Sequence, residues 1–213
     1  VVRLDAVGPA TVTTNDYAVR ESDPDGRFNL RYTLTVSGTY ETTVYVNSEP
    51  VVSETVTVSP AAAHGPECIT TGLANTMQAG VETSFAIAVH DQYGNAITSG
   101  GAVIDARLTG PKFIGTKVTM DAATGIYVVS FSTSRMGRYV LHARVEGTTG
   151  YLDLPDSPME VIVGPGVLNL EVSASTLGGS ATSSFTAGDS VMLTVGPSDL
   201  YGNHVEPDAG FGY

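Results

Sequence analysis

The pattern Asp-X-Tyr-Gly-Asn occurs twice in this chain, at residues 91–95 and 199–203. The tyrosines at 93 and 201 are 108 residues apart, and so are the alanines of the preceding steps Ala79-Gly80 and Ala187-Gly188. Two markers at one separation indicate that a unit of about a hundred residues is repeated. The sequence therefore predicts a tandem array of domains rather than one large domain.

Most of the chain has the alternation that is typical of β-strands. Segments 85–89, 127–131 and 139–145 each carry large apolar side chains at every second position. Residues two apart lie on one face of a strand, so each segment would turn these side chains towards a core. Glycine and proline interrupt the segments at short intervals, and no convincing helix is predicted. The predicted fold class is all-β, in tandem antiparallel β-sandwiches of the immunoglobulin type.

The first segment of the chain matches the second half of the repeat. Gly8-Pro9 corresponds to Gly110-Pro111, and Gly38-Thr39-Tyr40 corresponds to Gly137-Arg138-Tyr139. The positions expected to face the core then coincide, in the pairs Phe28 and Tyr127, Leu30 and Val129, Tyr32 and Phe131, Val46 and Val145. We expect residues 1–63 to be the C-terminal half of a repeat, 64–165 a complete repeat, and 166–213 the N-terminal half of a further one. The chain would then be a segment of a longer array.

The charge of the chain argues against two classes of partner. It carries 22 acidic and 10 basic residues, a net charge of −12, without a Lys/Arg cluster. Nucleic acid and anionic membranes bind proteins through such clusters. No apolar run approaches the roughly 20 residues that span a bilayer. A single cysteine, Cys68, cannot form an intrachain disulfide, which favours a reducing compartment.

The repeated Asp-X-Tyr-Gly-Asn pattern allows two interpretations. Asp and Asn oxygens are suitable ligands for calcium. Glycine and asparagine also tolerate positive φ, and aspartate accepts hydrogen bonds from nearby backbone amides, as in tight turns. We favour the turn.

No catalytic, metal or cofactor site is predicted. The histidines are scattered, without the short spacing of a zinc site, at His64, His90, His142 and His204. Cys68 is interpreted as a small buried side chain rather than a nucleophile. No serine lies in a Gly-X-Ser-X-Gly context, so we expect no enzyme.

Tyr40 and Tyr139 each follow a glycine by two residues at the start of a predicted strand. This placement is that of the tyrosine corner of immunoglobulin-like sandwiches, a structural feature.

The order of motifs in the complete repeat resembles that of a filamin-type immunoglobulin repeat. The sequence has Gly65-Pro66, Ala79-Gly80, Gly110-Pro111, Gly137-Arg138-Tyr139, a closing Ser157-Pro158 and the junction Gly164-Pro165-Gly166. Two departures occur. The first segment has Val52-Ser53-Glu54-Thr55 where Ser-Pro is expected, and the third has an expanded stretch at 173–184 before its Ala-Gly step.

The resemblance implies a surface for partner proteins. In filamin-type repeats the third and fourth strands form an edge to which a peptide adds as an extra strand. The matching stretches are 102–108 and 114–120, and the residues expected to line the groove are Ile104, Ala106, Ile114, Thr116 and Val118. Alternatively, Asp105, Arg107 and Lys117 protect an unused edge from aggregation.

The resemblance further implies a structural, protein-binding segment of a large cytoskeletal protein in the cytoplasm. The composition, rich in alanine, glycine and threonine and poor in lysine, suggests an algal or protist protein and a cilium as its setting. Partners would be other proteins, bound by strand addition or by packing between repeats. One alternative is an extracellular adhesion array on a cell or gamete surface, or of the bacterial adhesin type. A second alternative is a non-catalytic accessory module of a larger enzyme. The flanking sequence would discriminate between these possibilities.

Overall fold

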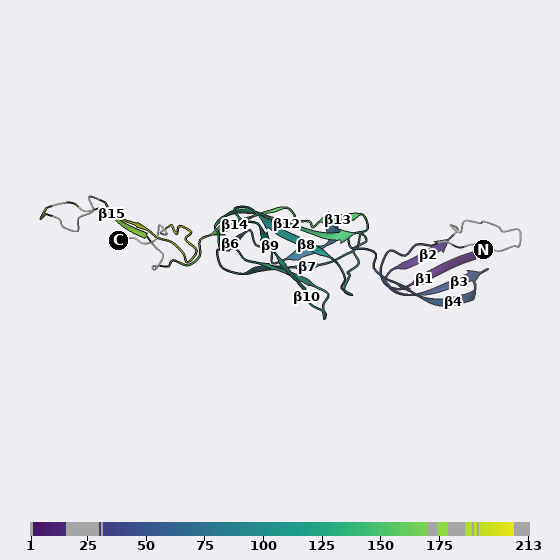
Figure 1. The fold of residues 1–213 in the computed structure, drawn as a ribbon. Helices are drawn as coiled ribbons and strands as arrows, with labels where there is room; N and C mark the ends of the chain where they lie inside the picture. The colour runs from purple at the N-terminus through teal and green to yellow at the C-terminus, as the bar shows by residue number, and fades with distance from the viewer. Residues whose placement is uncertain are drawn as a thin grey trace.

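The computed structural model describes residues 2–15, 30, 32–169, 174–178, 186–188, 190 and 192–206. Within these ranges the regular structure is β-strand, apart from one short 3-10 turn, η1 (Gly65–Glu67), so the predicted all-β class is confirmed. The strands are grouped along an elongated molecule, with β1–β4 at one end and β15 near the other (Figure 1).

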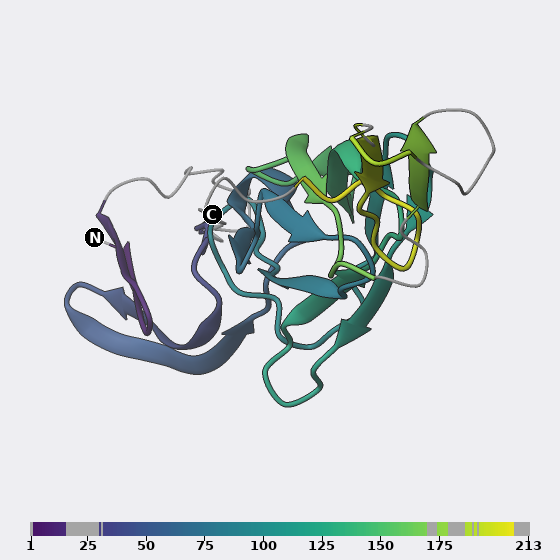
Figure 2. The same ribbon diagram turned by 90° about the vertical axis from the view of Figure 1, so that its left-hand side faces the viewer.

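The N-terminal group is a single antiparallel sheet with the strand order β2-β1-β3-β4. Its strands are β1 (Val2–Val7), β2 (Thr11–Asn15), β3 (Gly38–Val46) and β4 (Glu49–Val58). Leu4, Ala6 and Tyr40 are buried on one face of this sheet. In the end-on view of Figure 2, these purple and blue strands form one curved layer.

The central group is a β-sandwich of two sheets. The first has the order β10-β11-β7-β5, and its strands are β5 (Ile69–Thr71), β7 (Thr83–Ala88), β10 (Lys117–Met120) and β11 (Tyr127–Phe131). The second has the order β6-β14-β12-β8-β9, with β13 also paired to β12. Its strands are β6 (Thr76–Gln78), β8 (Ile104–Thr109), β9 (Ile114–Gly115), β12 (Gly137–Gly147), β13 (Gly150–Asp153) and β14 (Met159–Gly164). Only β6 and β14 are parallel among these pairings; the others are antiparallel.

The core of the sandwich is formed by the alternating positions that the sequence predicts. Residues 85, 87 and 89, then 127, 129 and 131, and then 139, 141, 143 and 145 are all buried. The rings of Phe85 and Phe131 meet edge to face across the first sheet, with centroids 6.5 Å apart. Burial of aromatic and branched side chains is the main stabilising contribution to such a sandwich.

The N-terminal sheet has the strand register of half of the central sandwich. Ala6 of β1 lies opposite Thr42 of β3, as Leu108 of β8 lies opposite Leu141 of β12. Val46 is nevertheless 39% exposed, whereas its counterpart Val145 is fully buried. The difference arises because, in the part of the chain that the structure describes, no second sheet covers the face of β1–β4. Of the other paired positions, Leu30 is half-buried and Tyr32 is exposed, and Phe28 lies outside the described residues.

The departure at residues 52–55 has a structural reason. Strand β4 runs along β3 as one strand from Glu49 to Val58, with one shift of register between Val44 and Tyr45, and the Thr42 hydroxyl donates to the Glu54 carbonyl at 2.8 Å. In the central sandwich the same path is divided into β13 and β14 by a loop that contains Ser157-Pro158. The loop is held to β12 because the Ala143 N–H donates to the Ser157 hydroxyl at 2.9 Å. The first segment has no such loop, so it does not need the Ser-Pro step.

The C-terminal group begins in the same way as the central sandwich. Strands β15 (Ala174–Gly178) and β16 (Met192–Gly196) form an antiparallel pair in which Ala174 lies opposite Gly196, as Ile69 lies opposite Ala88 in the pair β5–β7. Most of the expanded stretch at 173–184 lies outside the described residues.

Candidate functional site

The segment 91–95 is a tight turn, so this interpretation of the pattern is confirmed. The Gly94 N–H donates to the Asp91 carbonyl at 3.0 Å, and Gly94 has a φ of 80°, which favours glycine. The backbone N–H groups of Tyr93 and Asn95 both donate to Asp91 Oδ1, each at 2.9 Å. Asp91 therefore closes the turn with its side chain.

The last residue of the turn reaches out of the central sandwich. Asn95 Oδ1 accepts a hydrogen bond from the Ser37 N–H at 2.8 Å, and Asn95 Nδ2 donates to the Thr35 carbonyl at 2.8 Å. Residues 35–37 precede β3 of the N-terminal sheet. The asparagine side chain thus pairs with the main chain of the preceding group as a neighbouring strand would.

The linker to the sandwich is bound to the same turn. The Ala61 N–H donates to Asp91 Oδ2 at 2.8 Å, and the His64 N–H donates to the His90 carbonyl at 2.8 Å. Asp91 Oδ2 also accepts from Asn95 Nδ2 at 2.8 Å. We refer to residues 35–37, 61–64 and 90–95 together as joint 1.

The second copy of the pattern makes the same bonds one repeat later. Asn203 Oδ1 accepts from the Met136 N–H at 3.1 Å, and Asn203 Nδ2 donates to the Ser134 carbonyl at 2.9 Å. The Gly166 N–H donates to Asp199 Oδ2 at 2.7 Å. Residues 134–136, 166–169 and 198–203 form joint 2.

Each joint is attached to a tyrosine corner, which confirms the role expected of the two tyrosines. The Tyr40 hydroxyl donates to the Val36 carbonyl at 2.8 Å, and the Tyr139 hydroxyl donates to the Arg135 carbonyl at 2.9 Å. Both tyrosines are completely buried. The loops 35–37 and 134–136 are therefore held by their own sheets as well as by the turn of the next group.

The two aspartates are buried carboxylates whose bonding capacity is filled by N–H donors. Asp91 and Asp199 are both 0% exposed. Burial raises the pKa of each, but the asparagine amide and three backbone N–H groups outweigh it and hold the pKa below its usual range. Each carboxylate accepts four N–H bonds, two on each oxygen. This arrangement leaves the carboxylate no lone pair directed at a cation.

Joint 2 also contains a close aromatic contact. A Cβ atom on Gly80, which has a φ of 82°, would collide with the phenol of Tyr201. Tyr201 therefore packs directly on the backbone of the central sandwich. Its counterpart Tyr93 in joint 1 is 53% exposed.

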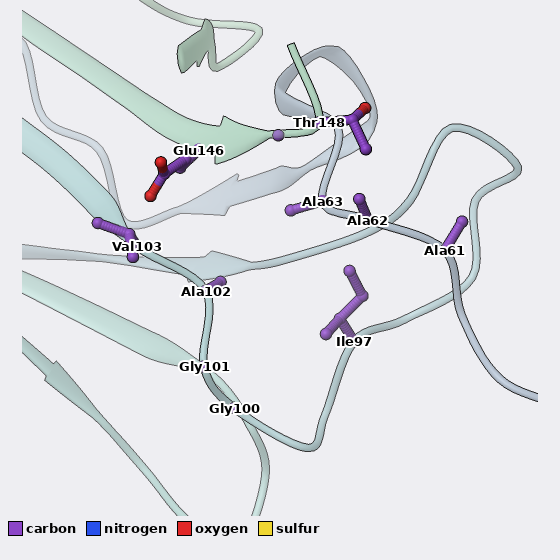
Figure 3. Close-up of a pocket in the computed structure, with 11 residues that line it drawn as sticks. Ala61, Ala62, Ala63, Ile97, Gly100, Gly101, Ala102, Val103, Glu146 and Thr148 are labelled. Atoms are coloured by element: carbon purple, nitrogen blue, oxygen red, sulfur yellow. The ribbon is translucent and has the colours of Figure 1, made fainter. Parts of the chain in front are cut away.

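The linker of joint 1 borders a shallow cavity. The cavity has a volume of about 350 Å³ and small or aliphatic lining, including Ile97, Gly100 and Ala102. Figure 3 shows Ala61, Ala62 and Ala63 passing along one side of it, opposite Val103 and Glu146. A second cavity of about 310 Å³ shares the same three alanines. Among the described residues, the titratable side chains in the two linings are Glu146 in the first and His64 in the second.

The predicted groove residues lie on β8 and along the β9–β10 segment, and all but Thr116 belong to the core or pack against it. Ile104, Ile114 and Val118 are half-buried and pack against the core of the sandwich, and Ala106 is buried. The Thr116 hydroxyl donates to the Ala106 carbonyl at 2.8 Å. Asp105 and Arg107 are on the opposite side of β8, where Asp105 pairs with Arg144 at 2.6 Å. The edge strand β9 has only two residues and pairs with β8 only at Arg107 and Leu108. The remaining residues of β8 therefore lie at the edge of the sheet without a paired strand on that side.

The remaining sequence candidates are structural or isolated. Cys68 is buried, its thiol donates to the His64 carbonyl at 3.4 Å, and burial raises its pKa. Within the described ranges, no three His, Cys, Asp or Glu side chains gather as a metal ion would require. None of the helical structure in those ranges could cross a membrane.

Sequence reasoning found the turn but missed the joint. The partners of Asn95 are 58 and 60 residues away in the sequence, so no local pattern identifies them. One signal was present. The turn itself needs the aspartate and the glycine, yet both copies also end in asparagine.

Comparisons with known proteins bear on the fold. No protein-family model and no curated protein sequence matches this chain. Among solved structures, the Escherichia coli adhesin FdeC matches 78% of this chain and 52% of its own, with a TM-score of 0.52 and 20% identity. Yersinia pseudotuberculosis InvD matches 80% of this chain and 52% of its own, with a TM-score of 0.50 and 20% identity.

Two further structures are relevant. Invasin, described as a bacterial integrin-binding protein, matches 96% of this chain and 40% of its own, with a TM-score of 0.52 and 16% identity. The filamin domain of Lin-41 matches 50% of this chain and 100% of its own, with a TM-score of 0.42 and 18% identity. This chain thus spans about half or less of the FdeC, InvD and invasin chains that it matches. It has the immunoglobulin-like β-sandwich fold.

Proposed function

We propose that this chain is a rod-forming segment of a cell-surface protein of the adhesin type. Its immunoglobulin-like repeats, divided at 63/64 and 165/166, would hold binding domains of the parent protein at a fixed distance and orientation. The observation that carries the proposal is the recurrence of one joint. Joint 1 and joint 2 contain the same turn, the same buried aspartate and the same asparagine bonds to the preceding group.

The joints are suited to this role because they restrain orientation with several bonds at once. A hydrogen bond contributes about 0.5–1.5 kcal/mol net, and one to a charged group about 1.5–3 kcal/mol. In each joint the aspartate binds the linker and the asparagine binds the corner loop, at two separate points. A flexible glycine-rich linker alone would leave the repeats free to rotate.

The cell-surface setting is preferred to the cytoskeletal one. It is supported by the adhesin-type proteins with TM-scores of 0.50 or more, FdeC and invasin among them. The filamin-type assignment is supported by the order of sequence motifs in residues 65–166. We include no catalytic step and no cofactor in the proposal, and contacts with other proteins would be its mode of action.

The rod can be tested in solution. A compact domain of this length would have a radius of gyration of roughly 17 Å. Small-angle X-ray scattering of the 213-residue chain should give a clearly larger value and the profile of an elongated particle. A value near that of a compact domain would contradict the rod.

The location can be tested on intact cells. An antibody raised against the central sandwich should label the parent protein without permeabilisation. Labelling that requires permeabilisation, with staining along filaments or cilia, would support the cytoskeletal alternative instead.

We also propose the strand edge at β9 as a contact for a partner peptide, with Ile104, Ala106, Ile114, Thr116 and Val118 beneath it. The support is the short edge strand and the exposed Phe113 beside it, 65% accessible. An extended peptide of alternating valine and threonine can serve as the probe in nuclear magnetic resonance titrations. Shifts should concentrate on backbone amides of β8 and β9, and shifts concentrated elsewhere would reject the edge.

A further inference from the structure

A crevice of about 610 Å³ lies beside joint 2, with basic side chains around it. Lys112, Arg135 and His204 line it together with Ser134, Tyr201 and Asn203. Lys112 follows the Gly110-Pro111 turn, Arg135 belongs to the corner loop, and His204 follows the Asp-X-Tyr-Gly-Asn turn. Three separate segments of the chain thus bring cationic or protonatable groups to one crevice.

These cations are unusual in this chain. Of the seven lysines and arginines among the described residues, four form ion pairs, namely Arg3, Arg107, Arg138 and Arg144. Lys112, Lys117 and Arg135 form none with the described acidic side chains. Two of these three unpaired cations line the crevice, in a chain whose net charge is −12.

Joint 1 shows that the joint itself does not require these charges. By the shared geometry of turn, corner loop and asparagine, Lys112 corresponds to Ala10, Arg135 to Val36 and His204 to Ala96. All three positions are aliphatic in joint 1. The basic residues are therefore an addition to joint 2 rather than part of its construction.

We propose that the joint 2 crevice binds an acidic polysaccharide, through its sulfate or carboxylate groups. Arginine and lysine form charge-assisted hydrogen bonds with such oxyanions, and Ser134 adds a hydroxyl. Lys112, Arg135 and His204 are all exposed, so an extended polymer has access to them.

The aromatic side chain and the size of the crevice favour a sugar over an isolated anion. Tyr201 packs against Gly80 and remains 48% exposed, which leaves an apolar surface for a sugar ring beside the cations. A volume of about 610 Å³ lies within the range of roughly 300–1,000 Å³ that is typical of ligand sites and exceeds the needs of one sulfate.

Among the residues that the structure describes, no acidic side chain lines the crevice. Asp199 is buried and fully bonded by N–H donors. Glu206 lies two residues after His204 and is not part of the lining. The net negative charge of the chain would repel a polyanion at long range, so binding should be local and weakened by salt. The choice of a polysaccharide rests on the proposed cell-surface role, whereas anion binding by the crevice does not.

The test uses the 213-residue chain and defined probes at low ionic strength, about 0.02 M salt, where charge interactions extend roughly 20 Å. Calorimetric titrations with heparin and hyaluronate are compared with neutral dextran, poly-L-glutamate and inorganic sulfate. The test variant is Lys112→Ala/Arg135→Val/His204→Ala, which installs the residues of joint 1. The control is Lys117→Ala, which removes an unpaired cation from β10 instead.

We expect heparin or hyaluronate to bind the wild-type chain and the triple variant to lose about tenfold or more in affinity, which corresponds to about 1.4 kcal/mol. The control should change affinity less than about twofold. The melting temperature should be the same for all variants, because joint 1 already accommodates the substituted residues.

Several outcomes would overturn the proposal: no binding of either polysaccharide, an equal loss in the Lys117→Ala control, or equal affinity for poly-L-glutamate. The last result would assign the crevice to an acidic peptide. None of these results bears on the rod, which scattering measures independently.

The reciprocal experiment transfers the site. Ala10→Lys/Val36→Arg/Ala96→His should give joint 1 the same crevice chemistry and raise the number of bound polysaccharide segments from one to two per chain. An unchanged stoichiometry would mean that the three side chains are insufficient and would contradict the assignment.

Discussion

Tyr139 and Asn203 bind adjacent carbonyl groups of one loop. The Tyr139 hydroxyl donates to the Arg135 carbonyl at 2.9 Å, and Asn203 Nδ2 donates to the Ser134 carbonyl at 2.9 Å. The tyrosine belongs to the core of the central sandwich, whereas the asparagine comes from the group that follows it. The corner loop is thus held by Tyr139 from within its own sandwich and by Asn203 from the following group.

Removing the asparagine side chain should loosen one joint and leave the sandwich folded. Asn203→Ala deletes the bonds to Ser134 and Met136 and one bond to Asp199, so we expect a loss of about 2 kcal/mol from joint 2. Nitrogen-15 relaxation should then show that the residues after 169 tumble independently of the central sandwich. Asn75→Ala is the control, because Asn75 is exposed and its backbone carbonyl accepts from Ile162 in either variant. Uniform tumbling of Asn203→Ala would contradict the role of the joint.

Loss of a tyrosine-corner hydroxyl should cost stability in the sandwich itself. Tyr139→Phe leaves the Arg135 carbonyl without its donor and also removes a 3.1 Å contact with the Thr133 hydroxyl. We expect the free energy of unfolding to fall by about 1–2 kcal/mol in denaturant titrations. Tyr151→Phe, at a position 44% exposed, should change it by less than about 0.5 kcal/mol. Equal effects of the two substitutions would show that the hydrogen bond of the tyrosine corner adds nothing to the free energy of unfolding.

Acid should weaken both joints. The pKa values of Asp91 and Asp199 are lowered in the folded chain, so their stabilising contribution is present above the unfolded value of about 3.9. It is lost as the pH falls through the lower folded-state pKa, when the protonated carboxyls no longer accept four hydrogen bonds well. Hydrogen exchange of the Ala61 and Gly166 amides, which donate to these carboxylates, should therefore show progressively less protection as the pH is lowered below the unfolded value.

A matched variant separates this effect from general acid destabilisation. Asp121 also has a lowered pKa, because the Ala123 N–H and the Thr124 hydroxyl donate to it, but it lies in an exposed turn. Asp121→Asn should leave the acid response of Ala61 and Gly166 unchanged, whereas Asp199→Asn should abolish that of Gly166. Full protection of Gly166 at low pH in the wild-type chain would refute the assignment.

Two glycines allow strain and steric contact to be distinguished. Gly80 and Gly94 have φ values of 82° and 80°, so alanine should cost each about 1 kcal/mol from backbone strain. A Cβ on Gly94 meets nothing within 4 Å, whereas one on Gly80 collides with Tyr201. Gly80→Ala should therefore displace joint 2, visible as shifted resonances of residues 199–203, and Tyr201→Ala should restore them. If Gly94→Ala shifts the resonances of joint 2 as strongly, the steric explanation is wrong.

The sequence predicts best what depends on local periodicity. Alternation at 127–131 identified three buried side chains correctly, and a glycine two positions before a tyrosine identified both tyrosine corners. Those features depend on pleating and on neighbours a few residues away. Periodicity alone does not predict the exposure of Val46, because its burial depends on whether a second sheet covers the sheet to which it belongs. The joints depend on contacts between residues 58 to 69 positions apart, which periodicity does not encode.

Among the described residues, the bonds of Asn95 and Asn203 to the unit before them all go to peptide groups and none to a side chain. A unit that presents a tyrosine-corner loop, and a glycine where the central sandwich has Gly80, can therefore precede any unit that begins with the Asp-X-Tyr-Gly-Asn turn. A gene encoding such an array can gain, lose or reorder units by recombination without new matching substitutions at each boundary. The length of the rod could thus change by whole units during evolution, while the surface residues of each unit change independently.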